Sequence, residues 1–254
     1  MKKKWVIVAL ILALLVSITI ILVVISKRVV PKVVTIRGKI AIVIDDWGYH
    51  LDNLEVIGKI KQPLTCAILP NLKNSQLVAG KLNDFGFEIV LHLPMEPKEK
   101  YRLEKDTITT SIDLKHVQAI LKQDLASVEF AKGISNHMGS RITEDSRVSA
   151  LIISESKKRK LYFLDSFVTA KSVCPLLARK IKIRFAKRDI FLDNRDDPGY
   201  IKNQIIKLCN LARKNGQAVG IGHDRKNTLI VLQEVIPQLV RAGYKFVFVS
   251  EIAK

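Results

Sequence analysis

Several common functional signatures are missing from this chain of 254 residues. Its three cysteines, Cys66, Cys174 and Cys209, cannot all pair within one chain and form no CxxC motif. A disulfide scaffold is therefore excluded, and buried thiols are expected. Neither a dinucleotide-binding GxGxxG motif nor a P-loop is present, and the GxSxG and HExxH motifs of common hydrolases are also absent.

Acidic residues are absent from the first 38 positions, which hold seven lysines and arginines. An uncharged run from Trp5 to Ser26 lies between two basic clusters. At about 1.5 Å per residue it spans roughly 33 Å, enough to cross a bilayer core of about 30 Å. No Ala-x-Ala cleavage site follows it, so we predict an uncleaved membrane signal anchor over residues 1–28 and a linker over residues 29–38. Cleavage of the run as a signal peptide is the alternative.

Basic residues flank both ends of this run, so they do not decide its orientation alone. Signal anchors usually leave the larger domain outside, and residues 39–254 are therefore expected to be extracytoplasmic, in the periplasm or at the cell surface. A cytoplasmic domain attached to the membrane is the alternative. The chain carries a formal charge of +18, which favours anionic surroundings such as lipid headgroups or acidic envelope polymers. A basic solvated surface is the simpler interpretation, and no nucleic-acid-binding signature is present, so no nucleic-acid partner is expected.

Apolar runs alternate with amphipathic segments over residues 39–254, which we interpret as one α/β domain. Strands are expected at 40–45, 65–69, 87–92, 132–136, 161–165, 182–185 with an extension at 190–192, 217–222 and 245–249. Helices are expected at 50–61, 73–84, 113–129, 145–159, 199–214 and 227–242. The alternation implies parallel strands and right-handed crossovers, and seven or eight such units favour a barrel over an open sheet.

Polar or titratable residues directly follow six of the expected strands. They are Asp45-Asp46, His92, Asn136-His137, Asp165-Ser166, Asp193-Asn194 and, after a glycine, His223. In parallel α/β folds the carboxyl ends of the strands meet at one rim, where the chemistry takes place. A single polar residue at such a place is an ordinary turn, but imidazole and carboxylate gathered at one rim are what a hydrolytic metal site requires.

Each of these residues has a structural and a functional interpretation. The Asp45-Asp46 pair is either an acidic turn or a cation ligand next to a general base. His92 is either a core histidine or part of the rim, and Glu96 is a possible oxygen ligand or substrate contact. The loop with Asn136, His137 and Ser140 either caps the next helix or faces a ligand, and Asp193 could orient a histidine. His50 and His116 are expected on the surface of helices.

Taken together, the motifs resemble those of the divergent polysaccharide deacetylase family. The likeness rests on IDDWG (44–48), LHLPMEP (91–97), NHMGS (136–140), LDS (164–166), FLDN (191–194) and GIGH (220–223), and it runs from about residue 39 to 252 in the expected order. It implies a distorted (β/α)7 barrel and kinship with metal-dependent carbohydrate N- or O-deacetylases.

The resemblance also implies roles for individual residues. Asp45 matches the catalytic base, Asp46 and His92 match metal ligands, and His223 matches the general acid. Glu96 stands where typical deacetylases have their second metal-binding histidine, so His137 is the preferred third ligand, with Glu96 in reserve. Arg225 stands where the divergent family has a further histidine, which alters substrate contacts or protonation of the leaving group.

The expected function is removal of acetyl groups from an envelope polysaccharide or related carbohydrate polymer. Zn²⁺ or another divalent metal would be bound by Asp46, His92 and His137. The remaining polar residues of the rim are expected to contact substrate, and Asp165 or Asp193 to hold the tautomer of His223; these residues are Glu96, Asn136, Ser140, Asp165, Ser166 and Asp193. Two alternatives stay open: a non-catalytic membrane-anchored barrel that binds glycan or scaffolds an envelope complex, and a metal-dependent hydrolase of phosphate esters.

Overall fold

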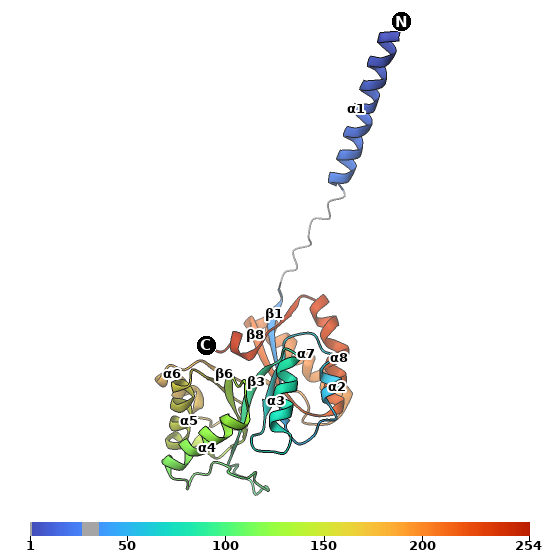
Figure 1. Cartoon of the computed structure of the whole chain (residues 1–254). Helices are drawn as coiled ribbons and strands as arrows, with labels where there is room; N and C mark the ends of the chain where they lie inside the picture. Colours follow the sequence, from blue (N-terminus) through green and yellow to red (C-terminus); the bar gives the residue numbers. More distant parts are fainter. Residues whose placement is uncertain (1, 27–35) are drawn as a thin grey trace. The chain divides into compact units, whose positions relative to one another are not determined.

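Two stretches of the chain, residues 2–26 and 36–254, are described by the computed structural model (Figure 1). They belong to two separate units of the chain, Met1–Thr35 and Ile36–Lys254. The first contains helix α1 (Lys2–Ser26), whose segment Lys3–Ile21 has a mean hydropathy of 2.6. This helix is long and apolar enough to cross a membrane, and a signal sequence would meet the same criterion. Most of the predicted linker, residues 29–35, lies outside the described residues.

Within residues 36–254, nine strands form one sheet in which every pairing is parallel. They are β1 (Gly38–Trp47), β2 (Thr65–Ile68), β3 (Glu88–Met95), β4 (Gly133–Met138), β5 (Tyr162–Asp165), β6 (Phe185–Lys187), β7 (Ile190–Phe191), β8 (Gln217–His223) and β9 (Tyr244–Phe246). Their order is β6-β5-β4-β3-β2-β1-β8-β7, and β9 pairs with β1. The sheet curls into a half-barrel with β6 and β7 at its two ends, which confirms the expected distorted barrel.

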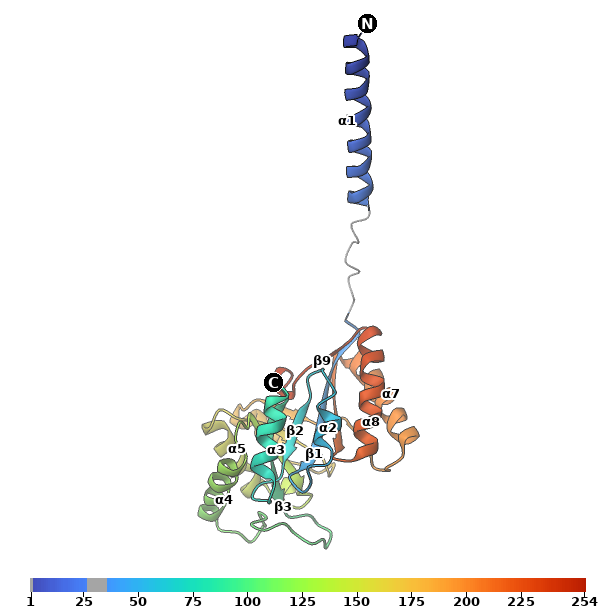
Figure 2. The same ribbon diagram turned by 45° about the vertical axis from the view of Figure 1, so that its right-hand side comes forward.

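Helices follow most strands and cover the outside of the curled sheet (Figure 2). They are α2 (Leu54–Ile57), α3 (Ser75–Asp84), α4 (Leu114–Ser127), α5 (Ser146–Lys158), α6 (Cys174–Ile181), α7 (Pro198–Asn215) and α8 (Lys226–Arg241), with 3-10 turns η1 (Ile142–Glu144) and η2 (Val249–Glu251). Asp145 and Asp197 begin α5 and α7 by accepting hydrogen bonds from backbone N–H groups of the first turn.

Three expectations about elements are wrong. The helix expected at 50–61 is reduced to the single turn α2, and His50 lies in an exposed loop before it. Helix α6 was not expected, because its eight residues show too little periodicity. Pro175 lies in its first turn, and Lys182, with a left-handed φ of 58°, ends it. That left-handed residue also displaces β6, which begins at Phe185 instead of residue 182.

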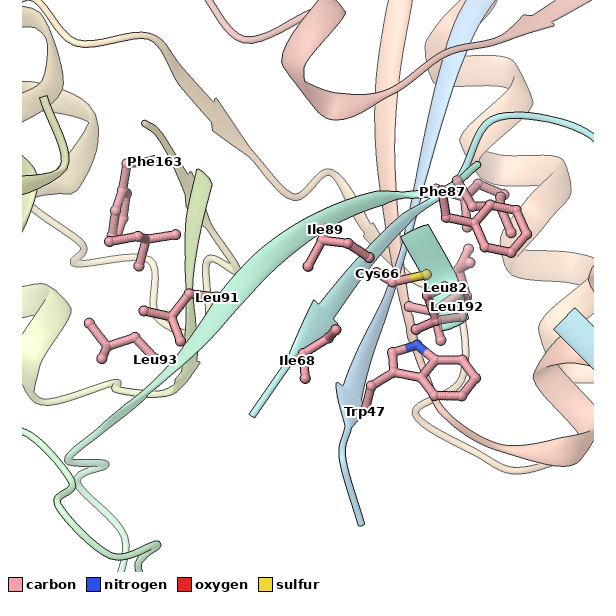
Figure 3. Packing of buried hydrophobic residues seen from close by; sticks show 14 of the residues in the cluster. Trp47, Cys66, Ile68, Leu82, Phe87, Ile89, Leu91, Leu93, Phe163 and Leu192 are labelled. Carbon is pink, nitrogen blue, oxygen red and sulfur yellow. The ribbon is translucent and has the colours of Figure 1, made fainter. Parts of the chain in front are cut away.

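Alternate strand residues fill two separate cores. Ile42, Ile44 and Cys66 belong to the core between sheet and helices, whereas Val43 and Ala67 belong to the smaller core inside the curl. Figure 3 shows the outer core, with Trp47, Cys66, Ile68, Leu82 and Ile89 packed together. Burial on both faces explains why these strands read as unbroken apolar runs.

All three cysteines are buried and free, as expected. Burial raises the pKa of Cys66 well above its usual value, that of Cys174 to about 12 and that of Cys209 to about 11. Thiols that hold their protons this strongly are inert, so they contribute packing and no chemistry.

The inner core is closed at the amino ends of the strands by a polar network around Glu88. Its Oε1 accepts hydrogen bonds from Thr65 Oγ1 (2.9 Å), Tyr162 Oη (2.8 Å) and the Ser250 backbone N–H (3.2 Å). The ring of Tyr162 lies directly against Gly133 of β4, where a Cβ would be 2.7 Å from ring carbons. Only glycine leaves room for this ring.

We predict that Gly133→Ala lowers the free energy of unfolding by about 1–3 kcal/mol, because the added methyl group displaces the Tyr162 ring. Gly80→Ala is the matched control, since a Cβ at this position of α3 meets no atom within 4 Å. It should raise the free energy of unfolding by about 0.5–1 kcal/mol, because alanine favours a helix. Chemical denaturation of both variants measures these changes, and equal effects would contradict the packing described for Gly133.

Candidate metal centre

The carboxyl end of β1 presents two consecutive carboxylates to one rim of the sheet. The pairing of β1 with β2 is irregular between Ile44 and Trp47, and Asp46 has a left-handed φ of 66°. Asp45 remains in the strand, in register with His223 of β8. Such a bulge redirects a side chain, and it lets the carboxylates of Asp45 and Asp46 both approach His92.

Asp46, His92 and His137 converge at this rim from β1, β3 and β4. The Asp46 Oδ1 atom lies 2.9 Å from His137 Nδ1 and 3.2 Å from His92 Nε2. The ligand atoms of the three residues lie within 4.8 Å of one another. Ser135 is 2.8 Å from the other imidazole nitrogen of His92, Nδ1, and thereby orients the ring with Nε2 toward Asp46. The sequence argument named all three converging residues but missed Ser135.

The charges of this cluster depend strongly on one another. Burial alone would raise the pKa of Asp46, but hydrogen bonds from His137 and His92 outweigh it and hold that pKa well below its usual range. Burial opposes protonation of His92, but the charges of Asp45 and Asp46 outweigh it and raise the pKa. A proton on His92 thus compensates the neighbouring carboxylates. One carboxylate oxygen and two imidazole nitrogens at such short separations are a donor set that fits a divalent metal such as Zn²⁺.

Asp45 is buried beside this cluster without a complete set of partners. Its Oδ1 is one of three buried side-chain atoms in the described residues that lack a hydrogen-bond partner, and its Oδ2 is 3.7 Å from His92 Nε2. Desolvation raises the pKa of Asp45 to about 6, although the nearby His92 acts in the opposite direction. An unpartnered carboxylate with a raised pKa is suited to accept a proton near neutral pH.

His223 stands at the end of β8 and is oriented by Asp193. Its Nδ1 lies 2.8 Å from Asp193 Oδ1, while its backbone N–H and Thr228 Oγ1 donate to Asp193 Oδ2. Burial alone would lower the pKa of His223, but the hydrogen bond and charge of Asp193 outweigh it, and the pKa is raised. The Phe191 ring stacks on the imidazole with its centroid 5.9 Å away, and the guanidinium of Arg188 lies over the Phe191 ring, 3.6 Å from its centroid.

A cavity of 430 Å³ opens over these groups. Among its lining residues, those expected from the sequence are Asp45, Asp46, His92, Asn136, His137, Ser166 and His223, and the others are Tyr101, Met138, Val168, Phe191 and Arg225. Asn136 and Ser166 fix one wall, because the Asn136 Oδ1 accepts the Ser166 N–H and the Ser166 hydroxyl donates to the Asn136 carbonyl.

The other four predicted site residues are not among the lining residues of this cavity. Glu96 Oε2 accepts hydrogen bonds from Thr110, and its Oε1 lies 3.3 Å from Arg141 Nε. Ser140 accepts a hydrogen bond from the Lys98 N–H, so both residues hold the loop that follows β3.

Asp165 accepts hydrogen bonds from the Phe167 N–H and the Ser172 hydroxyl. The carboxylate of Asp193 contacts Nδ1 of His223 and so positions that ring. These contacts assign positioning roles, and direct substrate contact by the four residues stays a prediction. Tyr101 and Arg188 were missed, because a loop tyrosine and a basic residue between two short strands carry no recognisable motif.

The protein thus belongs to the class of α/β proteins with a curled parallel sheet, and it carries a carboxylate and two histidines at the carboxyl ends of the strands. A family model of the divergent polysaccharide deacetylases matches residues 42–253. The chain therefore belongs to the divergent polysaccharide deacetylase family.

Among curated proteins, an uncharacterized protein of Escherichia coli K12 is 32% identical over 204 residues, which are 80% of this chain and 64% of that protein. Among solved structures, an uncharacterized protein from Agrobacterium tumefaciens C58 has a TM-score of 0.81 at 22% identity, covering 85% of this chain and 89% of the other.

More distant structures share the fold alone. The catalytic domain of a peptidoglycan N-acetylglucosamine deacetylase from Eubacterium rectale has a TM-score of 0.54 at 12% identity, covering 83% of this chain and 88% of its own. A pseudoenzyme of the CE4 family from Bacillus anthracis has a TM-score of 0.53 at 12% identity, covering 85% and 66%. Active and inactive proteins thus share this fold, and the fold does not decide catalysis.

We predict that Asp193→Asn lowers the pKa of His223, because it removes the negative charge that outweighs burial. If His223 acts as a general acid, the alkaline limb of the profile of hydrolysis rate against pH moves to lower pH, since the imidazole then loses its proton at a lower pH. NMR titration of the His223 ring protons measures the shift directly. Thr228→Val is the control, because it removes a hydrogen bond to Asp193 Oδ2 and leaves the contact between Oδ1 and His223. An unchanged His223 pKa in Asp193→Asn would refute this role of Asp193.

Proposed function

We propose that this chain is a metal-dependent hydrolase that removes acetyl groups from a carbohydrate polymer of the cell envelope. The observation that carries the proposal is the convergence of Asp46, His92 and His137, with the unpartnered Asp45 carboxylate beside them. Membership of the deacetylase family supports an acetylated carbohydrate as the substrate. The preference for His137 over Glu96 as third ligand agrees with the contacts of Glu96, whose two oxygens are engaged by Thr110 and Arg141.

The residues around the cavity divide the steps of acetyl hydrolysis between them. A divalent ion held by Asp46, His92 and His137 would polarise the acetyl carbonyl and make a bound water more acidic. Asp45 Oδ1 accepts the proton of the attacking water, for which its raised pKa is suited. His223 donates a proton to the departing amine or hydroxyl, and Asp193 holds its Nδ1–H so that Nε2 faces the cavity.

The apolar wall of the cavity suits a sugar ring. Tyr101 and Phe191 line it together with Val168, while Asn136 and Ser166 supply polar groups. Aromatic faces next to a few polar groups are typical of small-molecule sites. In the proposed arrangement α1 anchors the chain in a membrane and the cavity lies on the extracytoplasmic side, where envelope polymers are found.

A second candidate function is glycan binding without catalysis. It is favoured by Arg225, which stands where the family resemblance implies a histidine and donates to the Asp193 carbonyl at 2.8 Å. A guanidinium beside the proposed general acid could bind an anionic group of a glycan without taking part in proton transfer.

The metal and the acetyl product decide between these functions. We predict that the full-length chain in detergent binds about one divalent ion, measured by mass spectrometry of the metal content after dialysis. Asp46→Ala should lose both the ion and acetate release, because it removes the ligand shared by the two histidines. Asp45→Asn should keep the ion but lose activity by about 10²–10⁴-fold, as expected when a general base is removed.

Glu96→Gln is the matched control for the assignment of the metal ligands, and it should keep the metal, because both oxygens of Glu96 are engaged by Thr110 and Arg141. Metal binding without acetate release from acetylated envelope glycan would favour the binding protein, while metal retained in Asp46→Ala would contradict the assigned ligands.

The anchor is tested separately. We predict that α1 stays attached, so that the mature protein has the mass of the full chain and remains in the membrane fraction after extraction with sodium carbonate. The reason is that the uncharged run is longer than a signal-peptide core and is followed by lysine and arginine. A mature protein shortened by about 26 residues would identify the run as a cleaved signal sequence.

A further inference from the structure

The end of the half-barrel opposite the metal centre contains a second hollow. Its volume is 590 Å³, and it lies where β3, β4 and β5 begin and where α3, α4 and α5 end. An adjoining hollow of 400 Å³ lies where α6 ends and β6 begins, and the two share Arg184. Neither hollow includes a residue of the proposed metal centre.

Exposed cations surround both hollows. We call them the basic face, and they are Lys132, Arg159, Lys160, Arg179, Lys182 and Arg184. Their charges come from the ends of four different elements, and only Arg159 and Lys160 belong to a basic run in the sequence, over residues 157–160. By contrast, the loop over residues 96–106, at the metal end, holds four acidic and four basic residues and is balanced.

The positive charge of the basic face is mostly uncompensated. Glu88 is the one acidic side chain among the described residues that line the two hollows, and it is buried and bound to Thr65 and Tyr162. Arg159 pairs with Glu155, which also binds Lys158. Within residues 36–254, none of Lys132, Lys160 and Lys182 has a carboxylate within salt-bridge distance.

Apolar side chains lie among these charges. Phe87, Phe130 and Phe248 line the larger hollow, and the side chain of Phe130 is 47% exposed. A combination of cations and exposed aromatic side chains suits a partner with anionic groups next to apolar ones, and the surface of an anionic bilayer has this character.

The chain reaches the half-barrel at this same end. β1 begins at Gly38, and the C-terminus lies near its start, as Figures 1 and 2 both show. β4 is three strands away from β1, roughly 15 Å at the usual strand spacing. The ten residues from Ser26 to Ile36 span at most about 35 Å. A connection of this length allows the basic face to reach a bilayer that α1 enters.

We propose that the basic face binds the anionic lipid headgroups of the membrane in which α1 is anchored. The inference rests on the anchor of the proposed function. Electrostatic attraction acts only within about 8–10 Å at physiological salt, but a short tether provides an effective concentration in the millimolar range, so weak contacts suffice. Binding through this face directs the metal centre, at the other end of the strands, away from the bilayer and toward the envelope polymer.

The test uses the full chain in nanodiscs made either of phosphatidylcholine or of phosphatidylcholine with phosphatidylglycerol. Hydrogen–deuterium exchange should slow at least threefold in peptides covering residues 129–133 and 158–162 in the anionic discs only. Raising the salt from 50 to 500 mM should remove the protection, because the contact is electrostatic.

Two matched variants assign the effect to the basic face. Lys132→Glu with Lys160→Glu should abolish the protection, since each unit of charge changes the binding constant by about fivefold. Lys73→Glu with Lys105→Glu makes the same charge change at exposed positions of the opposite end and should leave it intact. Unchanged metal content in both variants shows that they fold.

Several results would overturn the inference. Equal exchange in both kinds of disc would show that the face does not bind anionic lipid. Protection in neutral discs after addition of glycerol phosphate or of a soluble acidic polysaccharide would assign the face to a free anion or to a polymer. Failure of the chain to enter discs would contradict the membrane anchoring of α1 on which the inference rests. Loss of acetate release while the protection persists would contradict only the proposed deacetylase activity.

Discussion

The carboxylate of Asp46, shared between the imidazoles of His92 and His137, is the contact on which the proposed chemistry depends. It joins β1 to β3 and β4, although β2 separates β1 from β3. Strand β2 has only four residues and ends at Ile68, and the bulge in β1 turns Asp46 into a left-handed conformation. The convergence of these three side chains thus accompanies one short strand and one irregular strand.

The surrounding residues hold these groups in position. Ser135 orients His92, Asp193 and Thr228 orient His223, and the Asn136–Ser166 pair forms a wall. These contacts are buried except for the one between His223 and Asp193, which is partly buried, so competition from solvent is limited. Glu96 is part of this support, because it fastens the loop after β3 through Thr110 and Arg141. This role accounts for an acid at a position where the family resemblance implies a histidine.

Much of this arrangement could be predicted from the sequence. Apolar runs that alternate with amphipathic segments indicate parallel strands, and the polar residues directly after these runs indicate the rim where the strands end. The strand ends at Asp45, His92 and His223 were legible for that reason. What could not be predicted depends on backbone conformations and distant contacts. The left-handed Lys182 shifts β6, and the loop after β3 brings Tyr101 to the cavity. No local pattern encodes these features, and the basic face as a whole could not be predicted either, because most of its charges come from separate elements.

The pairing of Asp45 with His223 in adjacent strands has a further consequence. The separation between the two residues assigned to proton transfer is set by backbone hydrogen bonds between β1 and β8, in the middle of the sheet. Val168 and Phe191, by contrast, lie near the unpaired margins of the curl. If the proposed roles hold, changes at these margins can alter which substrate fits without changing the distance between the proposed acid and base, so substrate preference can diverge faster than reaction type.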